Sequence, residues 1–372
     1  MSSLEEQITA VEDEIRNTSY NKATSGHIGR LRAKVAALRL EREKRAKGSG
    51  GGLGYGVRKG GHATVGLVGY PSVGKSTLLT AITGAKSESA AYDFTTLTII
   101  PGMLTWGGAA IQVLDMPGLV PGAAKGRGRG REVLSVIRSV ELVLFMIDAE
   151  HTDFKALLAE LENAGIRINS RPPKIVVTPG LRGGIVVTST VRRTQLTDEL
   201  AVDIAHEFGM HNGSIVFRED ASADQLIDVL AGNRVYLRGI LAVNKADLIE
   251  PKEKERLKGQ LKGSSPLFLS AKTGTGVPEL VDAIGHALAF IRVYLKPPGR
   301  EADLVNPIIL QKGDRVEDLL RRLPTDLGVH FRTALVTGPS ARFTSQTVGR
   351  EHRLADKDVV TIVVHHGLAK AS

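Results

Sequence analysis

With 372 residues and a net charge of +9, the chain is long enough for two or more domains and basic enough to favour polyanionic partners such as RNA. Aromatic residues make up only 4%, which favours contacts to phosphates over stacking on bases. The absence of cysteine excludes disulfides and thiolate metal sites, and the chain has neither a membrane-spanning apolar run nor a basic signal sequence, so we expect a cytoplasmic protein without membrane contact.

Residues 1–47 are predicted to form a helical hairpin that is helix-turn-helix-like. Apolar residues recur at helical spacing in two runs on either side of Gly26. The first run is acidic and the second basic, so attraction between the helices explains part of the pattern. The excess positive charge of the second helix fits a solvated face and an RNA-contact face equally well. A glycine-rich linker, residues 48–61, follows.

A phosphate-binding loop is predicted at residues 69–76, GYPSVGKS, because it follows a strand-like apolar run and precedes a helical pattern. Its glycines let backbone N–H groups approach phosphate oxygens, helped by the positive end of the helix dipole. Lys75 is expected to reach the β- and γ-phosphates, and Ser76 to bind Mg²⁺. The candidate nucleotide-binding residues here are Gly69, Tyr70, Pro71, Ser72, Val73, Gly74, Lys75, Ser76 and Thr77.

Two segments that would sense the γ-phosphate follow. In residues 92–98, YDFTTLT, the hydroxyl of Thr96 (with Thr95 in reserve) is a candidate Mg²⁺ ligand, whereas a threonine-rich β-edge is the alternative. Asp115-Met116-Pro117-Gly118 closes a strand at 111–114, which places the Asp115 carboxylate near the metal and the Gly118 N–H near the γ-phosphate. We therefore assign catalytic roles to Lys75, Thr96 and Gly118, and Mg²⁺ binding to Ser76, Thr96 and Asp115.

Leu119 stands where many regulatory GTPases carry the glutamine that orients the attacking water. Leucine cannot hydrogen-bond a water, so we expect intrinsic hydrolysis to be slow or to use another group. The basic residues of 125–131 could add an arginine to the site, but a solvated loop or an RNA contact is the favoured interpretation.

A guanine-binding pattern follows two further strand-like runs. Asn244-Lys245-Ala246-Asp247 comes after residues 240–243, and the Asp247 carboxylate can accept hydrogen bonds from guanine N1–H and the 2-amino group, which adenine lacks. The Lys245 stem can lie along the base. Residues 270–272 come after 267–269 and can present an N–H to guanine O6. The candidate base-binding residues are Asn244, Lys245, Asp247, Ser270, Ala271 and Lys272.

The predicted fold class is α/β. Residues 48–165 and 237–290 form a P-loop GTPase core with a mostly parallel sheet flanked by helices, the last helix covering 277–290. Residues 166–236 exceed what this core needs and are predicted to be an α/β insertion, with strands at 175–177, 185–188 and 214–217 and helices at 196–208 and 223–230. The insertion is locally basic, which suits either RNA contact or packing against the switches. Residues 291–372 suit a ubiquitin-like β-grasp domain.

Nearly the whole chain resembles the developmentally regulated GTP-binding proteins, in the Obg-related group of translation-factor GTPases. The residues that carry the resemblance are 21–24 (NKAT), 94–97 (FTTL), 217–220 (FRED) and 232–236 (GNRVY). It implies that the insertion is S5-domain-2-like and that the C-terminal domain is a TGS domain. It also implies a GTPase with GTP/GDP and Mg²⁺ that is associated with ribosomes and translation and works with a dedicated partner protein.

The resemblance also raises the question of K⁺, which some relatives hold partly with an asparagine of the phosphate-binding loop. Ser72 stands at that position and is a shorter, weaker ligand, so K⁺ stimulation stays open.

The favoured function is a GTP-hydrolysing switch on ribosomes or RNA, without DNA specificity. The alternative is an RNA- or ribosome-binding scaffold with a structural guanine nucleotide. A P-loop kinase is opposed by Asn244 to Asp247.

Overall fold

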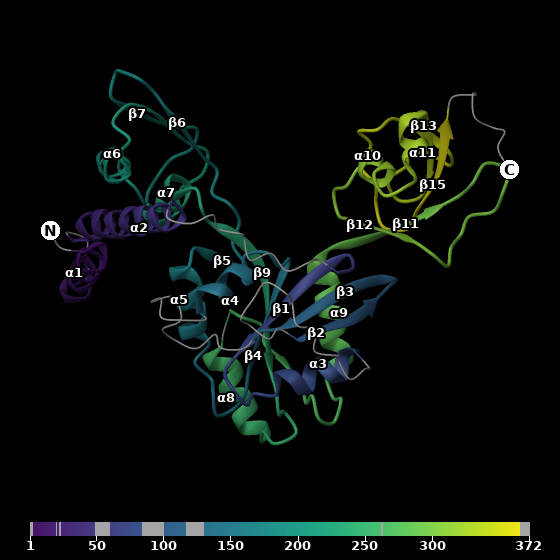
Figure 1. Ribbon diagram of the computed structural model, residues 1–372, viewed down its shortest axis with the longest axis horizontal. Helices are drawn as coiled ribbons and strands as arrows, with labels where there is room; N and C mark the ends of the chain where they lie inside the picture. Colours follow the sequence, from purple (N-terminus) through teal and green to yellow (C-terminus); the bar gives the residue numbers. More distant parts are fainter. Residues whose placement is uncertain are drawn as a thin grey trace. The chain divides into compact units, whose positions relative to one another are not determined.

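The computed structural model describes residues 3–19, 21, 24–48, 60–83, 100–116, 130–261 and 263–364 (Figure 1). By its internal contacts the chain divides into two compact units. One unit, called here the hairpin unit, joins residues 1–54 to residues 161–237. The other, called the GTPase unit, joins residues 55–160 to residues 238–372. The predicted helical hairpin is thus part of the same unit as the insertion.

The hairpin consists of α1 (Leu4–Asn17) and α2 (Ser25–Gly48). Helix α1 begins at a capping box, in which the Ser3 hydroxyl accepts the Glu6 N–H and the Glu6 carboxylate accepts the Ser3 N–H. The two apolar stripes expected from the sequence face each other, and their central residues are buried together: Ile8, Val11, Leu31 and Val35.

The insertion is a three-stranded sheet with helices on one face. The strand order is β6 (Ile175–Pro179), β8 (Gly213–Phe217), β7 (Ile185–Ser189), with β6 antiparallel and β7 parallel to β8. Helices α6 (Asp198–Glu207) and α7 (Ala223–Ala231) share a core with the inward side chains of the sheet, and Ala33 of α2 joins this core. Helix α6 is shorter than predicted because the Thr197 hydroxyl caps it, accepting the Leu200 N–H.

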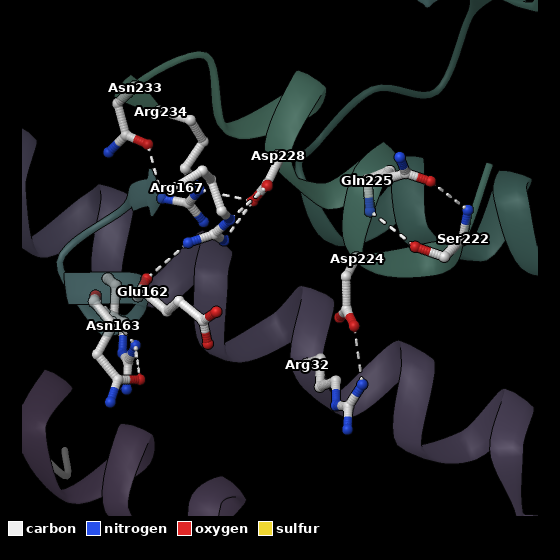
Figure 2. Close-up of polar contacts among 11 residues, drawn as sticks. Arg32, Glu162, Asn163, Arg167, Ser222, Asp224, Gln225, Asp228, Asn233 and Arg234 are labelled. Carbon is white, nitrogen blue, oxygen red and sulfur yellow. Dashed lines mark hydrogen bonds and ion pairs between the residues drawn. The ribbon is translucent and has the colours of Figure 1, made fainter. Parts of the chain in front are cut away.

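A buried cluster of charged groups lies beside α7 (Figure 2). The Asp228 carboxylate accepts hydrogen bonds from two guanidinium groups, those of Arg167 and Arg234. Arg167 belongs to β5 (Ile166–Ile168), which pairs with residues 235–237 at the start of β9 (Val235–Val243). Asn233 links the cluster to the hairpin, because its amide donates to the Glu43 carboxylate at 2.9 Å.

The GTPase unit is built on a mostly parallel sheet, in agreement with the predicted fold class. Its strand order is β10-β9-β4-β1-β3-β2, in which only β2 is antiparallel to its neighbour. The bounds not yet given are β1 (Ala63–Gly69), β2 (Ile100–Trp106), β3 (Ala109–Asp115), β4 (Leu142–Ile147) and β10 (Leu267–Phe268).

Helices cover both faces of this sheet. Because side chains alternate along a strand, Leu142, Leu144 and Met146 of β4 join the core formed with α3 (Lys75–Thr83) and α9 (Val277–Leu288). On the opposite face, Phe145 meets Phe154 of α5 (Phe154–Asn163) edge to face, with ring centroids 5.1 Å apart. The remaining helices of the core are α4 (Gly130–Ile137) and α8 (Pro251–Gln260). No helix of the described ranges is long and apolar enough to cross a membrane.

The C-terminal domain is a β-grasp sheet with the strand order β12-β11-β15-β13-β14, in which β11 and β15 are parallel. The predicted helix over 277–290 is too long, because Ala289 adopts φ 53° and ends α9, and Phe290 already belongs to β11. The elements are β11 (Phe290–Leu295), β12 (Ile308–Gln311), α10 (Val316–Leu320), α11 (Thr325–Val329), β13 (Phe331–Thr337), β14 (Gln346–Val348) and β15 (Asp358–Val364).

Candidate functional site

Those predicted motifs that fall within the described residues lie at one edge of the parallel sheet. The registers pair Leu67 with Asp115, Gly69 with Met146 and Val243 with Ile147, so β1, β3, β4 and β9 end at nearly the same level. The carboxyl ends of such strands form the usual ligand crevice of an open α/β sheet.

The backbone of the phosphate-binding loop depends on its two glycines. A Cβ on Gly69 would lie 2.1 Å from the Met146 carbonyl oxygen, and a Cβ on Gly74 would lie 2.4 Å from the Asn244 amide nitrogen. Gly74 also has φ 91°, and Ser72 has φ 63°, so the chain turns tightly before α3 begins. The first N–H groups of a helix have no acceptor within it, and here they border the loop.

Lys75 opens α3 and folds back over this loop. Its Nζ donates to the carbonyl oxygens of Gly69 at 3.1 Å and Tyr70 at 2.8 Å. Burial lowers the pKa of Lys75, and the nearby Asp115 carboxylate opposes that shift. The ammonium group is thus held within the loop, among carbonyl dipoles that a phosphate could replace.

Ser76 and Asp115 form an oxygen-rich pair beside the loop. The Ser76 hydroxyl donates to Asp115 Oδ2 at 2.7 Å, and Asp115 Oδ1 is buried without a hydrogen-bond partner among the described residues. A hydroxyl beside a carboxylate with a spare buried oxygen suits Mg²⁺, which prefers hard oxygen ligands. The predicted third ligand, Thr96, lies outside the described residues, as do Gly118 and Leu119.

Asn244 connects the phosphate-binding loop to the predicted base-binding loop. The buried Asn244 side chain donates from Nδ2 to the Val73 carbonyl at 2.8 Å and accepts the Ala271 N–H at 2.9 Å. Around it, Ser270 and Ala271 are buried, whereas Asp247 and Lys272 are exposed. The structure therefore brings residues 69–77, Asp115, residues 244–247 and residues 270–272 to the same edge of the sheet.

Asp148 is a further candidate site residue, which the predicted motifs do not include. It follows β4, is only 1% exposed, and lies 2.7 Å from the Lys245 Nζ through Oδ2. Its Oδ1 accepts the N–H groups of Glu150 at 3.1 Å and His151 at 2.8 Å. A signal existed, because Asp148 directly follows the apolar run 142–147, the same strand-end pattern that marks Asp115 and Asn244.

The electrostatics of Asp148 favour its charged form. Burial by itself would raise the pKa of Asp148, but the hydrogen bonds from Lys245 and His151 outweigh it and lower the pKa. The same ion pair raises the pKa of Lys245. The His151 ring in turn stacks on the Tyr70 ring, with centroids 5.6 Å apart. The ion pair with Asp148 thus holds the Lys245 ammonium group at the end of β4, next to the predicted base-binding loops.

Comparison with known proteins identifies similar domains over most of the chain. Residues 64–179 match a family model described as a 50S ribosome-binding GTPase, residues 182–290 match the C-terminal region of that domain, and residues 291–364 match the TGS domain.

Several curated proteins are similar along nearly their whole length. An uncharacterized GTP-binding protein of Methanocaldococcus jannaschii is 45% identical over 97% of this chain and 93% of its own. Developmentally-regulated G-protein 3 of Arabidopsis thaliana is 45% identical over 98% of this chain and 99% of its own. Developmentally-regulated GTP-binding protein 2 of Mus musculus is 42% identical over 96% of this chain and 98% of its own.

Proposed function

Because the chain belongs to the developmentally regulated GTP-binding proteins and is therefore a GTP-binding P-loop GTPase, we propose that it works as a Mg²⁺-dependent switch on ribosomes, with slow intrinsic hydrolysis. One observation carries this proposal: Lys75, the Ser76–Asp115 pair and Asn244 lie at the carboxyl ends of neighbouring parallel strands. A nucleotide with its phosphates on the loop would reach all of them.

The phosphate end is assigned to the loop and the switch segments. Residues 69–77 would bind the phosphates through backbone N–H groups and the Lys75 ammonium, which leaves its two carbonyl partners for phosphate oxygens. Ser76, Asp115 and Thr96 would hold Mg²⁺, which when bound neutralises charge on the β- and γ-phosphates. The Gly118 N–H would donate to the γ-phosphate, and Lys75, Thr96 and Gly118 are the proposed catalytic residues.

The base end is assigned to the two loops that Asn244 joins. Asp247 would accept hydrogen bonds from guanine N1–H and the 2-amino group, and the buried loop at 270–272 would donate an N–H to O6. Because Asp148 holds the Lys245 ammonium, the Lys245 stem is fixed where it can lie along the base.

Substitution of Asp247 by asparagine tests the base assignment. The asparagine side chain has one acceptor oxygen and one donor NH₂ group, so one of the two guanine donors would face another donor. We therefore expect the preference for GTP over ATP to fall by a factor of about 100, or about 3 kcal/mol. Competition binding with GTP, ATP and xanthosine triphosphate measures this. An unchanged preference for GTP would show that the base is read elsewhere.

Ribosome association is supported by the family models and by charge. The model matched by residues 64–179 is described as a ribosome-binding GTPase, and a TGS domain follows at 291–364. The net charge of +9 favours an RNA-rich target. A dedicated partner protein, cytoplasmic location and K⁺ stimulation are further parts of the proposal, the last weakened by Ser72.

Steady-state GTP hydrolysis with and without purified ribosomes tests the switch, in K⁺ buffer and again in Na⁺ buffer. We expect ribosomes to stimulate turnover, because Leu119 cannot orient water and the target would supply the missing group. The Lys75→Ala variant is the control, since it should abolish the stimulated rate. Flat, near-zero turnover in every condition would refute the switch and favour the alternative, a ribosome-binding scaffold with a structural guanine nucleotide.

A further inference from the structure

The three-stranded sheet of the hairpin unit has one face without a helix. Helices α6 and α7 pack on the face that carries the buried Ile175, Ile215 and Phe217. Because side chains alternate along a strand, the residues between these point away from that core. Among them, Val176 is 41% exposed and Val186 is 56% exposed. Nothing in the described part of this unit covers the outward face.

The strand registers place an unusual set of side chains on this outward face. Val176 and Val216 are partners, as are Thr178 and Ser214, and Thr188 lies next to Val216 on the other side. One step further along, the Arg218 N–H donates to the Lys174 carbonyl at 2.9 Å, so the Lys174 and Arg218 side chains are cross-strand neighbours. The face therefore carries hydroxyls, valines and two adjacent cations, with no acidic residue at these positions.

Two like charges directly opposite each other on a sheet repel, so the Lys174–Arg218 pair costs stability unless an anion bridges it. Within the described residues, neither side chain forms an ion pair, and both are exposed. The neighbouring acid Glu219 has other partners: its carboxylate accepts hydrogen bonds from the Arg171 guanidinium at 2.8 Å and from the Lys174 backbone N–H at 3.0 Å.

The other basic element of the same unit is used differently. On α2, Arg30 and Arg32 pair with Asp203 and Asp224, at 3.5 and 2.9 Å. These exposed pairs add little stability, but they place a carboxylate beside each of the two arginines. On the outward sheet face, by contrast, Lys174 and Arg218 form no ion pair within the described residues.

We infer that this outward face, centred on Lys174 and Arg218, is a docking surface for duplex RNA. The two cations would bind phosphates, the flanking hydroxyls of Thr188 and Ser214 would contact phosphate or ribose 2′-OH groups, and the valines would pack against sugars. The face has no aromatic side chain for base stacking, so recognition is of the A-form backbone and not of sequence. This inference deepens the RNA association in the proposed function and assigns it to a surface of the hairpin unit.

The test is binding of the full-length protein to a fluorescent RNA duplex of about 20 base pairs, measured by anisotropy at several KCl concentrations. The double variant Lys174→Ser/Arg218→Ser should weaken binding on the order of tenfold at about 100 mM salt and reduce the salt slope by about two. The matched control is Arg30→Ser/Arg32→Ser, which removes the same charge from the same unit and should change the affinity much less.

Three outcomes overturn the inference. Equal loss in both double variants would mean that only net charge matters, and unchanged binding by Lys174→Ser/Arg218→Ser would place the RNA elsewhere. Equal affinity for a DNA duplex of the same sequence would exclude recognition of the ribose 2′-OH. None of these refutes the GTPase switch, which is judged by ribosome-stimulated hydrolysis, and GTP affinity measured on each variant shows that the nucleotide site is intact.

Discussion

Replacing Asp228 by asparagine tests whether the buried cluster beside α7 holds the hairpin unit together (Figure 2). The carboxylate accepts from Arg167 at 2.6 and 2.7 Å and from Arg234 at 2.8 Å. Asparagine offers one oxygen in place of two, so at least one of these three bonds is lost and an amide N–H₂ faces a guanidinium N–H.

The expected magnitude follows from burial. Breaking one side of a buried ion pair costs about 3–5 kcal/mol, and a hydrogen bond to a charged group contributes about 1.5–3 kcal/mol. Arg167 and Arg234 side chains are 21% and 14% exposed and can partly rehydrate, which favours the lower end. We expect about 3 kcal/mol of lost stability, or a fall of about 1–3 M in the urea midpoint of this unit.

Asp224→Asn is the matched control, because Asp224 lies on the same helix and pairs with Arg32 in a solvated setting. Those two side chains are 57% and 47% exposed, so the control should lose no more than about 0.5 kcal/mol. Urea unfolding followed by far-UV circular dichroism measures both variants. Trp106, the sole tryptophan of the chain, belongs to the GTPase unit, and its fluorescence reports on that unit separately. Indistinguishable midpoints for the two variants would refute the reasoning.

Two further substitutions probe the nucleotide site. Asp148→Asn keeps an oxygen for the loop N–H groups but loses the ion pair with Lys245, so the affinity for GTP, measured by calorimetric titration, should fall about tenfold. The control Glu150→Gln should change the affinity little. Equal effects of the two substitutions would mean that Asp148 does not position Lys245. Asn244→Ala leaves one carbonyl of the phosphate-binding loop and one N–H of the 270–272 loop without a hydrogen-bond partner. The loss should destabilise the GTPase unit by about 2–4 kcal/mol, measured by thermal unfolding. A Tm equal to that of the wild type would contradict the bridging role of Asn244.

The parts of the site that could be predicted are those encoded locally. The phosphate-binding loop, Asp115 and Asn244 each directly follow a strand-like run, so their place at the carboxyl edge of the sheet follows from the pattern alone. Asp148 shows the same pattern but was missed, because its role depends on Lys245, a partner from another strand end.

The pairing of charges on α2 could not be predicted for a similar reason. In sequence, the excess positive charge of this helix suits solvent and RNA equally well, and only the fold brings Asp203 and Asp224 to Arg30 and Arg32. Short strands such as β5 and β14 were also missed, since three residues carry too little periodicity to stand out. The end of α9 was misplaced because apolar residues continue past the left-handed Ala289.

Within the four-residue motif 244–247, we expect Asn244 to maintain the structure of the site and Asp247 to determine the preference for guanine. Asn244 is buried and joins the two loops that we assign to opposite ends of the nucleotide, so its loss should weaken GTP and ATP binding together and lower the Tm. Asp247 is exposed at the rim, so its substitution should change the ratio of GTP to ATP affinity while the Tm stays within about 1 °C. Measuring affinity for both nucleotides and Tm on the two variants tests this division. A shared phenotype would mean that Asp247, too, acts through the structure of the loop.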